Sequence, residues 1–140
     1  MFIVNVEGAI HNDGKWLLIR RSEKEEHAGG TLSLVGGKCD IEGASSDILE
    51  RTLKREVFEE VGIEVSGLKY VNSSSFVTDS GHNVIDIVFL CFLESGAPYA
   101  KSMDEVDDVL WMTTSEIMEH PEVPAYLKEN INQAEKLLNK

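Results

Sequence analysis

The chain has 140 residues, of which 42% are hydrophobic and 27% charged, and its formal net charge is −12 at pH 7. These proportions indicate a soluble globular protein that is large enough to bury a core. The acidic charge argues against duplex DNA or RNA as a partner, because binding to a phosphate backbone needs a basic surface. A small phosphorylated substrate remains open, since a bound divalent cation reverses the local charge.

Signals for membranes, secretion and disulfides are weak. The longest apolar run, residues 87–93, has only the length of a strand, whereas a membrane-spanning helix needs about 18 or more apolar residues. The N-terminus does not resemble a basic and then apolar leader. Cys39 and Cys91 lack metal-type spacing, so we expect free thiols, with Cys91 in the core. We therefore predict a cytoplasmic protein that has no membrane partner.

The first part of the sequence predicts a β-hairpin followed by loops. In chain order, the pattern favours a strand at 2–10, a turn at 12–14, a strand at 16–20, a loop at 22–30, a short strand at 31–35 and a flexible loop at Gly36-Gly37. The turn has the sequence Asn-Asp-Gly, which is typical of a tight hairpin.

A long helix is predicted from about Asp47 to Val61. Its apolar residues recur every four positions, at Leu49, Leu53, Val57 and Val61. Asp47 and Glu50 have the spacing of a capping box, which would satisfy free N–H groups at the start of the helix. Gly62 suits the position just after the helix end.

The remaining sequence predicts further strands and two more helices. In chain order we expect a strand at 63–77 with a break at 73–75, a turn at 79–81, a strand buried on both faces at 84–93, a turn at 95–98, a short strand at 109–112 and helices at 114–119 and 124–138. Mixed strands with one central and one terminal helix predict an α/β or α+β sandwich, in which a mixed β-sheet lies between helices.

The predicted central helix carries three carboxylates close together, Glu56, Glu59 and Glu60. At roughly 100° per residue, Glu60 falls inside the apolar stripe and Glu56 on its edge. A carboxylate in such a position is costly unless it is paired or binds a cation. The cluster therefore predicts a site for a hard metal ion, and a solvated acidic helix face is the alternative.

The spacing of these residues resembles a known signature. Gly36-Gly37-Lys38, a loop and then Arg55-Glu56-x-x-Glu59-Glu60-x-Gly62-Ile63 are similar to the conserved box of the Nudix hydrolases, a MutT-like superfamily. The resemblance implies the Nudix fold, with residues 1–140 as one Nudix hydrolase domain. It also implies an enzyme that uses Mg²⁺ or Mn²⁺ to hydrolyse the P–O–P bond of a small nucleoside diphosphate derivative, such as a (d)NTP, a nucleotide sugar or ADP-ribose.

The resemblance also implies roles for the residues of the box. Glu59 and Glu60 would bind the metal, and Glu56 would bind the metal or orient the attacking water. Arg55 would hold a carboxylate in place through its planar guanidinium group. The catalytic set implied within the helix is thus Arg55, Glu56 and Glu59.

The first half of the box departs from the family pattern. The loop between the glycines and the helix is four residues longer than usual, and Asp47 stands where the family has a glutamate. Val35 also stands where a proline often precedes the glycines. Asp47 has two interpretations, a substitute for that glutamate or no more than a helix N-cap.

Other candidates lie outside the helix. Glu105 is the predicted general base, although a solvated acidic loop explains that segment equally well. Gly36, Gly37 and Lys38 could contact a phosphate of the substrate. Arg20, Arg21 and Lys24, at the end of the second predicted strand, could do the same, and ordinary surface charge is the alternative for the charged residues.

Several functional alternatives are left open by the sequence. A catalytically weak nucleotide-sensing regulator would have the same fold, and an interaction module would use its acidic helix to bind a basic partner. An isomerase of diphosphate-bearing substrates would need a further catalytic residue such as Cys39. The sequence selects neither a nucleotide nor an oligomeric state, and a homodimer remains open.

Overall fold

The computed structural model describes residues 1–25 and 28–140. The elements in chain order are β1 (Phe2–Asn12), β2 (Lys15–Arg21), β3 (Leu32–Ser33), β4 (Val35–Lys38), α1 (Ile48–Val61), β5 (Glu64–Val77), β6 (Asn83–Ser95), β7 (Val106–Met112), α2 (Thr114–Glu119) and α3 (Ala125–Leu138). The predicted loop at 22–30 includes residues 26–27, which lie outside the described residues. No helix in the described part of the chain is long and apolar enough to cross a membrane.

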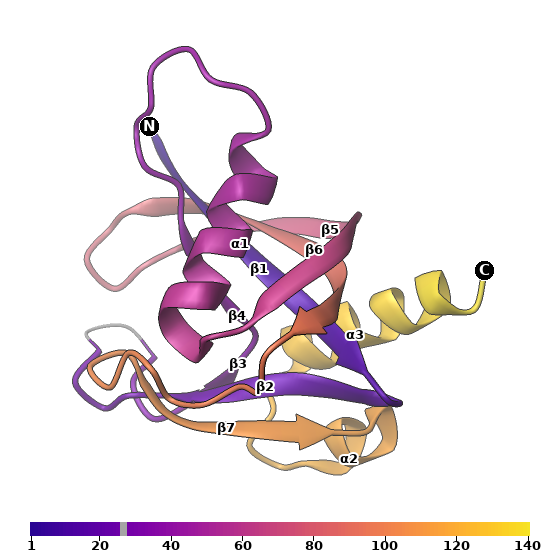
Figure 1. Cartoon of the computed structure of the whole chain (residues 1–140). Coiled ribbons are helices and arrows are strands. Elements are labelled where there is room, and N and C mark those ends of the chain that lie inside the picture. Colours follow the sequence, from indigo (N-terminus) through magenta and orange to yellow (C-terminus); the bar gives the residue numbers. More distant parts are fainter. Residues whose placement is uncertain (26–27) are drawn as a thin grey trace.

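The strands form one mixed sheet in the order β3-β2-β1-β6-β5, with β4 also pairing with β1 and β7 with β2 (Figure 1). β1 and β6 run parallel, and the other pairs are antiparallel. Four consecutive residues of β6, Val88 to Cys91, are buried. Successive residues of a strand point to opposite faces, so this run confirms the prediction of a strand buried on both faces.

The two faces of the sheet bury separate hydrophobic clusters. On one face, Leu53 and Val57 of α1 pack with Val6 and Ile10 of β1. On the other face, Leu127 and Ile131 of α3 belong to a cluster with Trp16 and Leu90. α1 and α3 therefore cover opposite sides of the sheet, which confirms the predicted α+β sandwich with its sheet between helices (Figure 1).

α1 ends as predicted but begins differently. Gly62 adopts a left-handed conformation at φ 72°, and its N–H donates to the Phe58 carbonyl at 3.0 Å. The predicted capping box at Asp47 is wrong, because Asp47 is itself left-handed (φ 53°) and its side chain caps no N–H group. An N-cap residue needs an extended backbone instead. Arg51 holds this end of the helix, since its Nε donates to the Ser46 carbonyl at 3.0 Å.

Two other local predictions need correction. Gly36 and Gly37 are not a flexible loop, because they lie in β4 and pair with Glu7 and Val6 of β1. β5 has no break at 73–75, since these serines pair in register with 85–87 of β6. The ladder supplied by β6 outweighs the weak strand preference of serine. The irregularities of β5 occur earlier, between Glu64 and Asn72.

Short-range signals elsewhere are confirmed. The β1–β2 hairpin turns through Asp13 and Gly14, both with positive φ (49° and 76°), as a two-residue loop of this kind requires. The helix predicted at 114–119 is α2, and it begins with an unpredicted capping box in which Thr113 accepts from the Glu116 N–H at 3.1 Å. Cys39 and Cys91 are free thiols, and Cys91 is fully buried.

Candidate functional site

The site is built where β4 passes beneath α1. A Cβ atom added to Gly37 would overlap the carboxyl group of Glu56, and one added to Gly36 would overlap the backbone of Val6. A side chain at position 36 would therefore meet fixed backbone, whereas one at position 37 would displace the end of the Glu56 side chain. Gly36 allows β4 to approach β1, and Gly37 leaves the space in which the Glu56 carboxylate lies.

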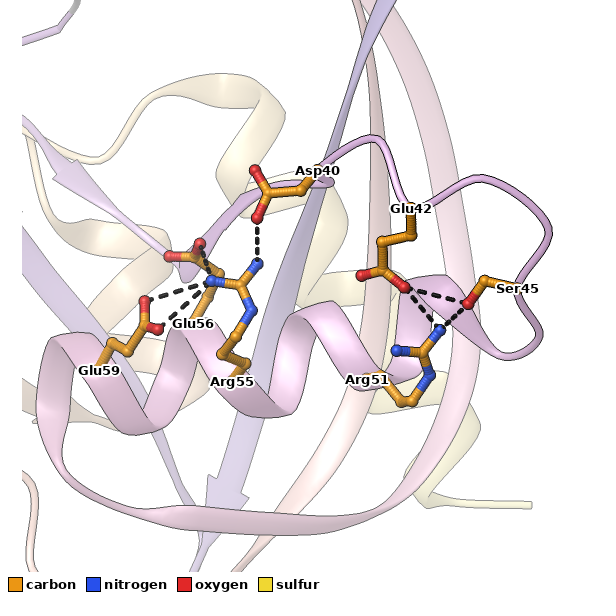
Figure 2. Close-up of polar contacts among 7 residues, drawn as sticks. All are labelled: Asp40, Glu42, Ser45, Arg51, Arg55, Glu56 and Glu59. Carbon is orange, nitrogen blue, oxygen red and sulfur yellow. Dashed lines mark hydrogen bonds and ion pairs between the residues drawn. The ribbon is translucent and has the colours of Figure 1, made fainter.

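Arg55 gathers the carboxylates on the outer side of α1. Its Nη1 donates to Glu56 at 3.1 Å and to Glu59 at 3.4 Å, and its Nη2 donates to Asp40 at 3.3 Å (Figure 2). Asp40 comes from the loop between β4 and α1, so a single guanidinium joins that loop to two glutamates of the box. The geometry is that of a residue that orients carboxylates.

Glu60 lies on the inner side of the helix, where it is only 5% exposed. Burial and, to a smaller extent, the charges of Glu105 and Glu56 together raise the pKa of Glu60 to about 9, while Arg21 opposes the rise. Burial also raises the pKa of Glu56, although Arg55 opposes this. The positive charge near each of these two carboxyls is thus too small to favour its ionised form.

Glu105 comes to the same region from a later segment of the chain. It directly precedes β7, and its backbone carbonyl accepts a hydrogen bond from the Ser22 N–H at 2.9 Å. The Glu105 charge contributes to the raised pKa of both Glu60 and Glu56, so Glu105 lies close enough to act on both carboxyls. The fold therefore brings Glu105 near Glu56 and Glu60 of α1, although the two segments are far apart in the sequence.

Arg20 and Lys38, two of the charged residues predicted to contact phosphate, differ in their surroundings. Arg20 donates to the Gly30 carbonyl at 2.9 Å and pairs with Glu122 at 3.1 Å. Lys38 ends β4 opposite Asn5 of β1, with its side chain exposed. Arg20 is thus already engaged with protein groups, whereas Lys38 is open to solvent.

Arg21, the neighbour of Arg20 at the end of β2, acts on the site itself. Arg21 lowers the pKa of Glu60, so it, rather than Arg20, is the cation that acts on this carboxyl. Neighbouring residues of a strand face opposite sides, and the sequence cannot tell which of the two arginines faces inward. The pairing of β2 with β7 also shifts register between them.

A second acidic pair lies within the sheet. Asp86 of β6 accepts from Asn5 Nδ2 at 2.8 Å. Burial raises the pKa of Glu7 well above its ordinary value, and a hydrogen bond with Asp86 adds to this rise. In the sequence, Glu7 and Asp86 are visible only as acidic residues within otherwise apolar strands, which is the signal that could have identified them.

The donor set suits a hard divalent cation. Carboxylate oxygens are the ligands that Mg²⁺ and Mn²⁺ prefer, and a buried carboxyl such as Glu60 would gain the compensating charge that it lacks. Within the described residues, no group of three His, Cys, Asp or Glu side chains lies close enough together to hold a metal ion in this arrangement. Glu56 and Glu59 instead contact Arg55 (Figure 2).

Comparisons with known proteins agree with this architecture. The sequence pattern of the NUDIX domain matches residues 1–132. The Nudix hydrolase YfcD of Salmonella typhi is 33% identical over 105 residues, which are 74% of this chain and 53% of that protein. The NAD-capped RNA hydrolase NudC of Vibrio atlanticus is 26% identical over 111 residues, 78% of this chain and 36% of NudC.

A solved structure extends the similarity to the fold. The MutT protein of Methanosarcina mazei superimposes with a TM-score of 0.82 at 26% identity, covering 99% of this chain and 96% of that one. This chain spans about half the length of YfcD, one of the curated relatives that it matches. From the domain match and the shared fold, we conclude that the chain belongs to the Nudix family.

Proposed function

We propose that this protein is a metal-dependent hydrolase that cleaves the P–O–P bond of a nucleoside diphosphate linked to another group. One observation carries the proposal: Glu60 is only 5% exposed in the helix that also carries Glu56 and Glu59, and its pKa is raised to about 9. A fold does not retain a buried carboxyl of this kind for stability, because an uncompensated charge there is unfavourable. A bound cation supplies the missing compensation.

Glu56, Glu59 and Glu60 would hold the cation, Mg²⁺ or Mn²⁺. When bound, it would neutralise negative charge on the diphosphate oxygens, which is the main requirement of phosphoryl transfer. Arg55 would keep Glu56 and Glu59 oriented through the contacts of 3.1 and 3.4 Å. Gly37 leaves room beside Glu56 for this arrangement.

Glu105 is the proposed general base. Its carboxylate would accept a proton from the attacking water as the oxygen of that water bonds to phosphorus and the bridging P–O bond breaks. The products would be a nucleoside monophosphate and pyrophosphate or a second phosphorylated fragment. Lys38, at the exposed end of β4, and the backbone of Gly36 and Gly37 are the proposed phosphate contacts, whereas Arg20 is engaged with Gly30 and Glu122.

The substrate class is tested with a panel. We would measure phosphate, pyrophosphate or nucleotide release from (d)NTPs, nucleotide sugars, ADP-ribose, NAD and dinucleoside polyphosphates, with Mg²⁺, with Mn²⁺ and with chelator. NAD is included because the relative NudC is named an NAD-capped RNA hydrolase. We expect metal-dependent release that falls by about 100-fold or more in Glu59→Gln, since a metal ligand is lost.

The controls separate the proposal from its alternatives. The Glu59→Gln protein should keep the far-ultraviolet circular dichroism of the wild type, because Glu59 is about half exposed, at 53%. Equal rates in the variant and the wild type would contradict the assignment of Glu59. Nucleotide binding without turnover across the whole panel would instead favour a sensor.

A further inference from the structure

The segment before β7 is attached to the last turn of α1. The Lys101 and Ser102 N–H groups donate to the Glu60 carbonyl at 3.0 and 3.3 Å, and the Tyr99 N–H donates to the Val61 carbonyl at 3.1 Å. The last carbonyls of a helix have no partner within the helix. Residues 99–102 therefore satisfy the end of α1 at the residue that carries the buried carboxyl.

The same segment continues directly to Glu105. The Glu105 N–H donates to the Ser102 carbonyl at 2.9 Å, and the Val106 N–H donates to it at 2.8 Å. Two backbone hydrogen bonds thus connect Glu60 to Glu105 through Ser102. Glu105, whose charge acts on the Glu60 carboxyl, is thus also connected to Glu60 through the backbone.

Two side chains hold this segment on the helix. The Tyr99 ring lies against Gly62, so closely that a Cβ atom there would be 2.5 Å from Tyr99 Cε1. Lys101 Nζ lies 3.8 Å from the centre of the Phe58 ring, within the range of a cation–π contact. Tyr99 is 53% exposed and Phe58 47% exposed, so neither is part of the hydrophobic core. Both aromatic rings therefore serve the contact between this segment and α1 rather than the hydrophobic core.

We propose that Tyr99 and Lys101 are positioning residues that hold Glu105 at its distance from Glu60 and Glu56. Tyr99 acts through its contact with Gly62, and Lys101 acts through its contact with Phe58. The catalytic consequence rests on the proposed function, whereas the attachment itself does not. Residues 96–101 form no helix or strand of their own, so these contacts replace regular structure in fixing the segment.

The first test uses a readout that does not depend on activity. Amide hydrogen exchange followed by NMR should show protected Lys101 and Ser102 N–H groups in the wild type. In Tyr99→Ala and Lys101→Met these amides should exchange about 10-fold faster or more, because the segment opens locally more often. Tyr99→Phe and Lys101→Arg keep the ring and the cation and should restore protection. Unchanged exchange in both Tyr99→Ala and Lys101→Met would overturn the proposal.

The second test is a double-mutant cycle with Glu105→Gln. Tyr99→Ala should lower kcat by about 10-fold or more and change KM much less, since only the placement of the base is altered. In the Glu105→Gln background, the same substitution should have no further effect. Tyr70→Ala is the matched control, because Tyr70 is 58% exposed on β5 and should leave kcat unchanged.

The outcomes distinguish this proposal from the proposed function. An equal loss of kcat in both backgrounds would mean that Tyr99 does not act through Glu105, and would overturn the positioning role alone. Wild-type-like turnover by Tyr99→Ala would do the same. A wild type that turns over no substrate of the panel would refute the proposed function, and with it the catalytic consequence of the attachment.

Discussion

Glu60 is the residue at which stability and the proposed function conflict most. Its neighbours along the helix face, Val57 and Val61, are fully buried, and Glu60 itself is 5% exposed. A carboxyl of ordinary pKa, about 4.3, would be ionised near neutral pH. Burial, together with the charges of Glu105 and Glu56, raises the pKa of Glu60 to about 9, so the metal-free native state holds a proton that the unfolded state releases.

This difference predicts how stability depends on pH. Between about pH 4.3 and 9 the unfolded state binds fewer protons at this site than the native state does, so the free energy of unfolding falls as pH rises. Below this window both states are protonated, so Glu60 does not change the free energy of unfolding with pH. Glu60→Gln cannot ionise, and its thermal midpoint in chelator should exceed that of the wild type by an amount that grows from pH 5 to pH 9.

The measurement is thermal unfolding by circular dichroism at several pH values, with Glu59→Gln as the control. Glu59 is 53% exposed, and its substitution by glutamine should leave the pH dependence close to that of the wild type. Parallel pH profiles for Glu60→Gln and the wild type would contradict the buried, protonated state of Glu60. The glutamine should also lower turnover, so that one substitution moves stability and activity in opposite directions.

At the scale of elements, the site depends on how closely β4 approaches α1. The two glycines of β4 serve different contacts, Gly36 with the backbone of β1 and Gly37 with the Glu56 side chain. A side chain on β4 would therefore disturb either the sheet or the carboxylate, depending on its position.

Gly37→Ala should damage the site more than the fold. The new Cβ must displace the Glu56 carboxyl, which is a side-chain end and can move, so we expect a stable protein with kcat/KM lower by about 10- to 100-fold. Kinetics and thermal unfolding of the same sample would check this. Wild-type activity in Gly37→Ala would contradict the proposed position of Glu56.

Two further glycine variants serve as controls for that prediction. Gly36→Ala meets the Val6 backbone, which cannot move without disturbing the sheet, so it should mainly lower stability. Gly43 lies in the loop before α1 with open space around it and φ 67°, so Gly43→Ala should cost only about 1 kcal/mol of backbone strain. Activity per folded molecule should survive in Gly43→Ala.

At the scale of the whole molecule, negative charge dominates. The formal net charge is −12, and the fold adds Glu105 to the glutamates of α1. Such a concentration of like charge disfavours the compact state, and a divalent cation at the site would relieve it locally.

Mg²⁺ or Mn²⁺ should therefore stabilise the wild type against thermal unfolding. At a concentration 100 times its dissociation constant, a ligand specific to the native state adds about 2.7 kcal/mol to the free energy of unfolding. The increase should disappear on chelation and be much smaller in Glu59→Gln. Scanning fluorimetry or calorimetry across a metal titration would measure it.

Ionic strength is the necessary control, because salt alone screens surface repulsion. Sodium chloride at matched ionic strength should give only the part of the stabilisation that Glu59→Gln also shows. Equal stabilisation of the wild type and Glu59→Gln by Mg²⁺ would reduce the effect to screening and contradict a specific site. Whether the protein forms a homodimer is a separate question, which sedimentation of the same samples would test.

Much of the fold was predictable because its signals are local. The apolar spacing of Leu53 and Val57 and the left-handed Gly62 specify α1 and its end, and Asp13-Gly14 specifies the first hairpin. These features depend on residues within a few positions of one another, so a short window of sequence contains the physical cause.

The failed predictions involve partners that are distant in the sequence. Gly36 and Gly37 became a strand because β1 lies beside them, and the serines at 73–75 stayed in β5 because β6 completes the ladder. Asp47 failed as a cap because its backbone is left-handed at the end of the long loop. Local preference was outweighed in each case by the path of the chain.

The sequence by itself determined the family signature, the helix that carries Glu56, Glu59 and Glu60, and the position of Glu60 within an apolar stripe. Only the tertiary structure decided which distant groups meet that helix. Glu105 comes near Glu60, Gly37 lies beneath Glu56, and Tyr99 covers Gly62 because strands and loops pack around α1. Periodicity fixes directions around one helix axis, whereas these contacts depend on packing between segments, which no local pattern encodes.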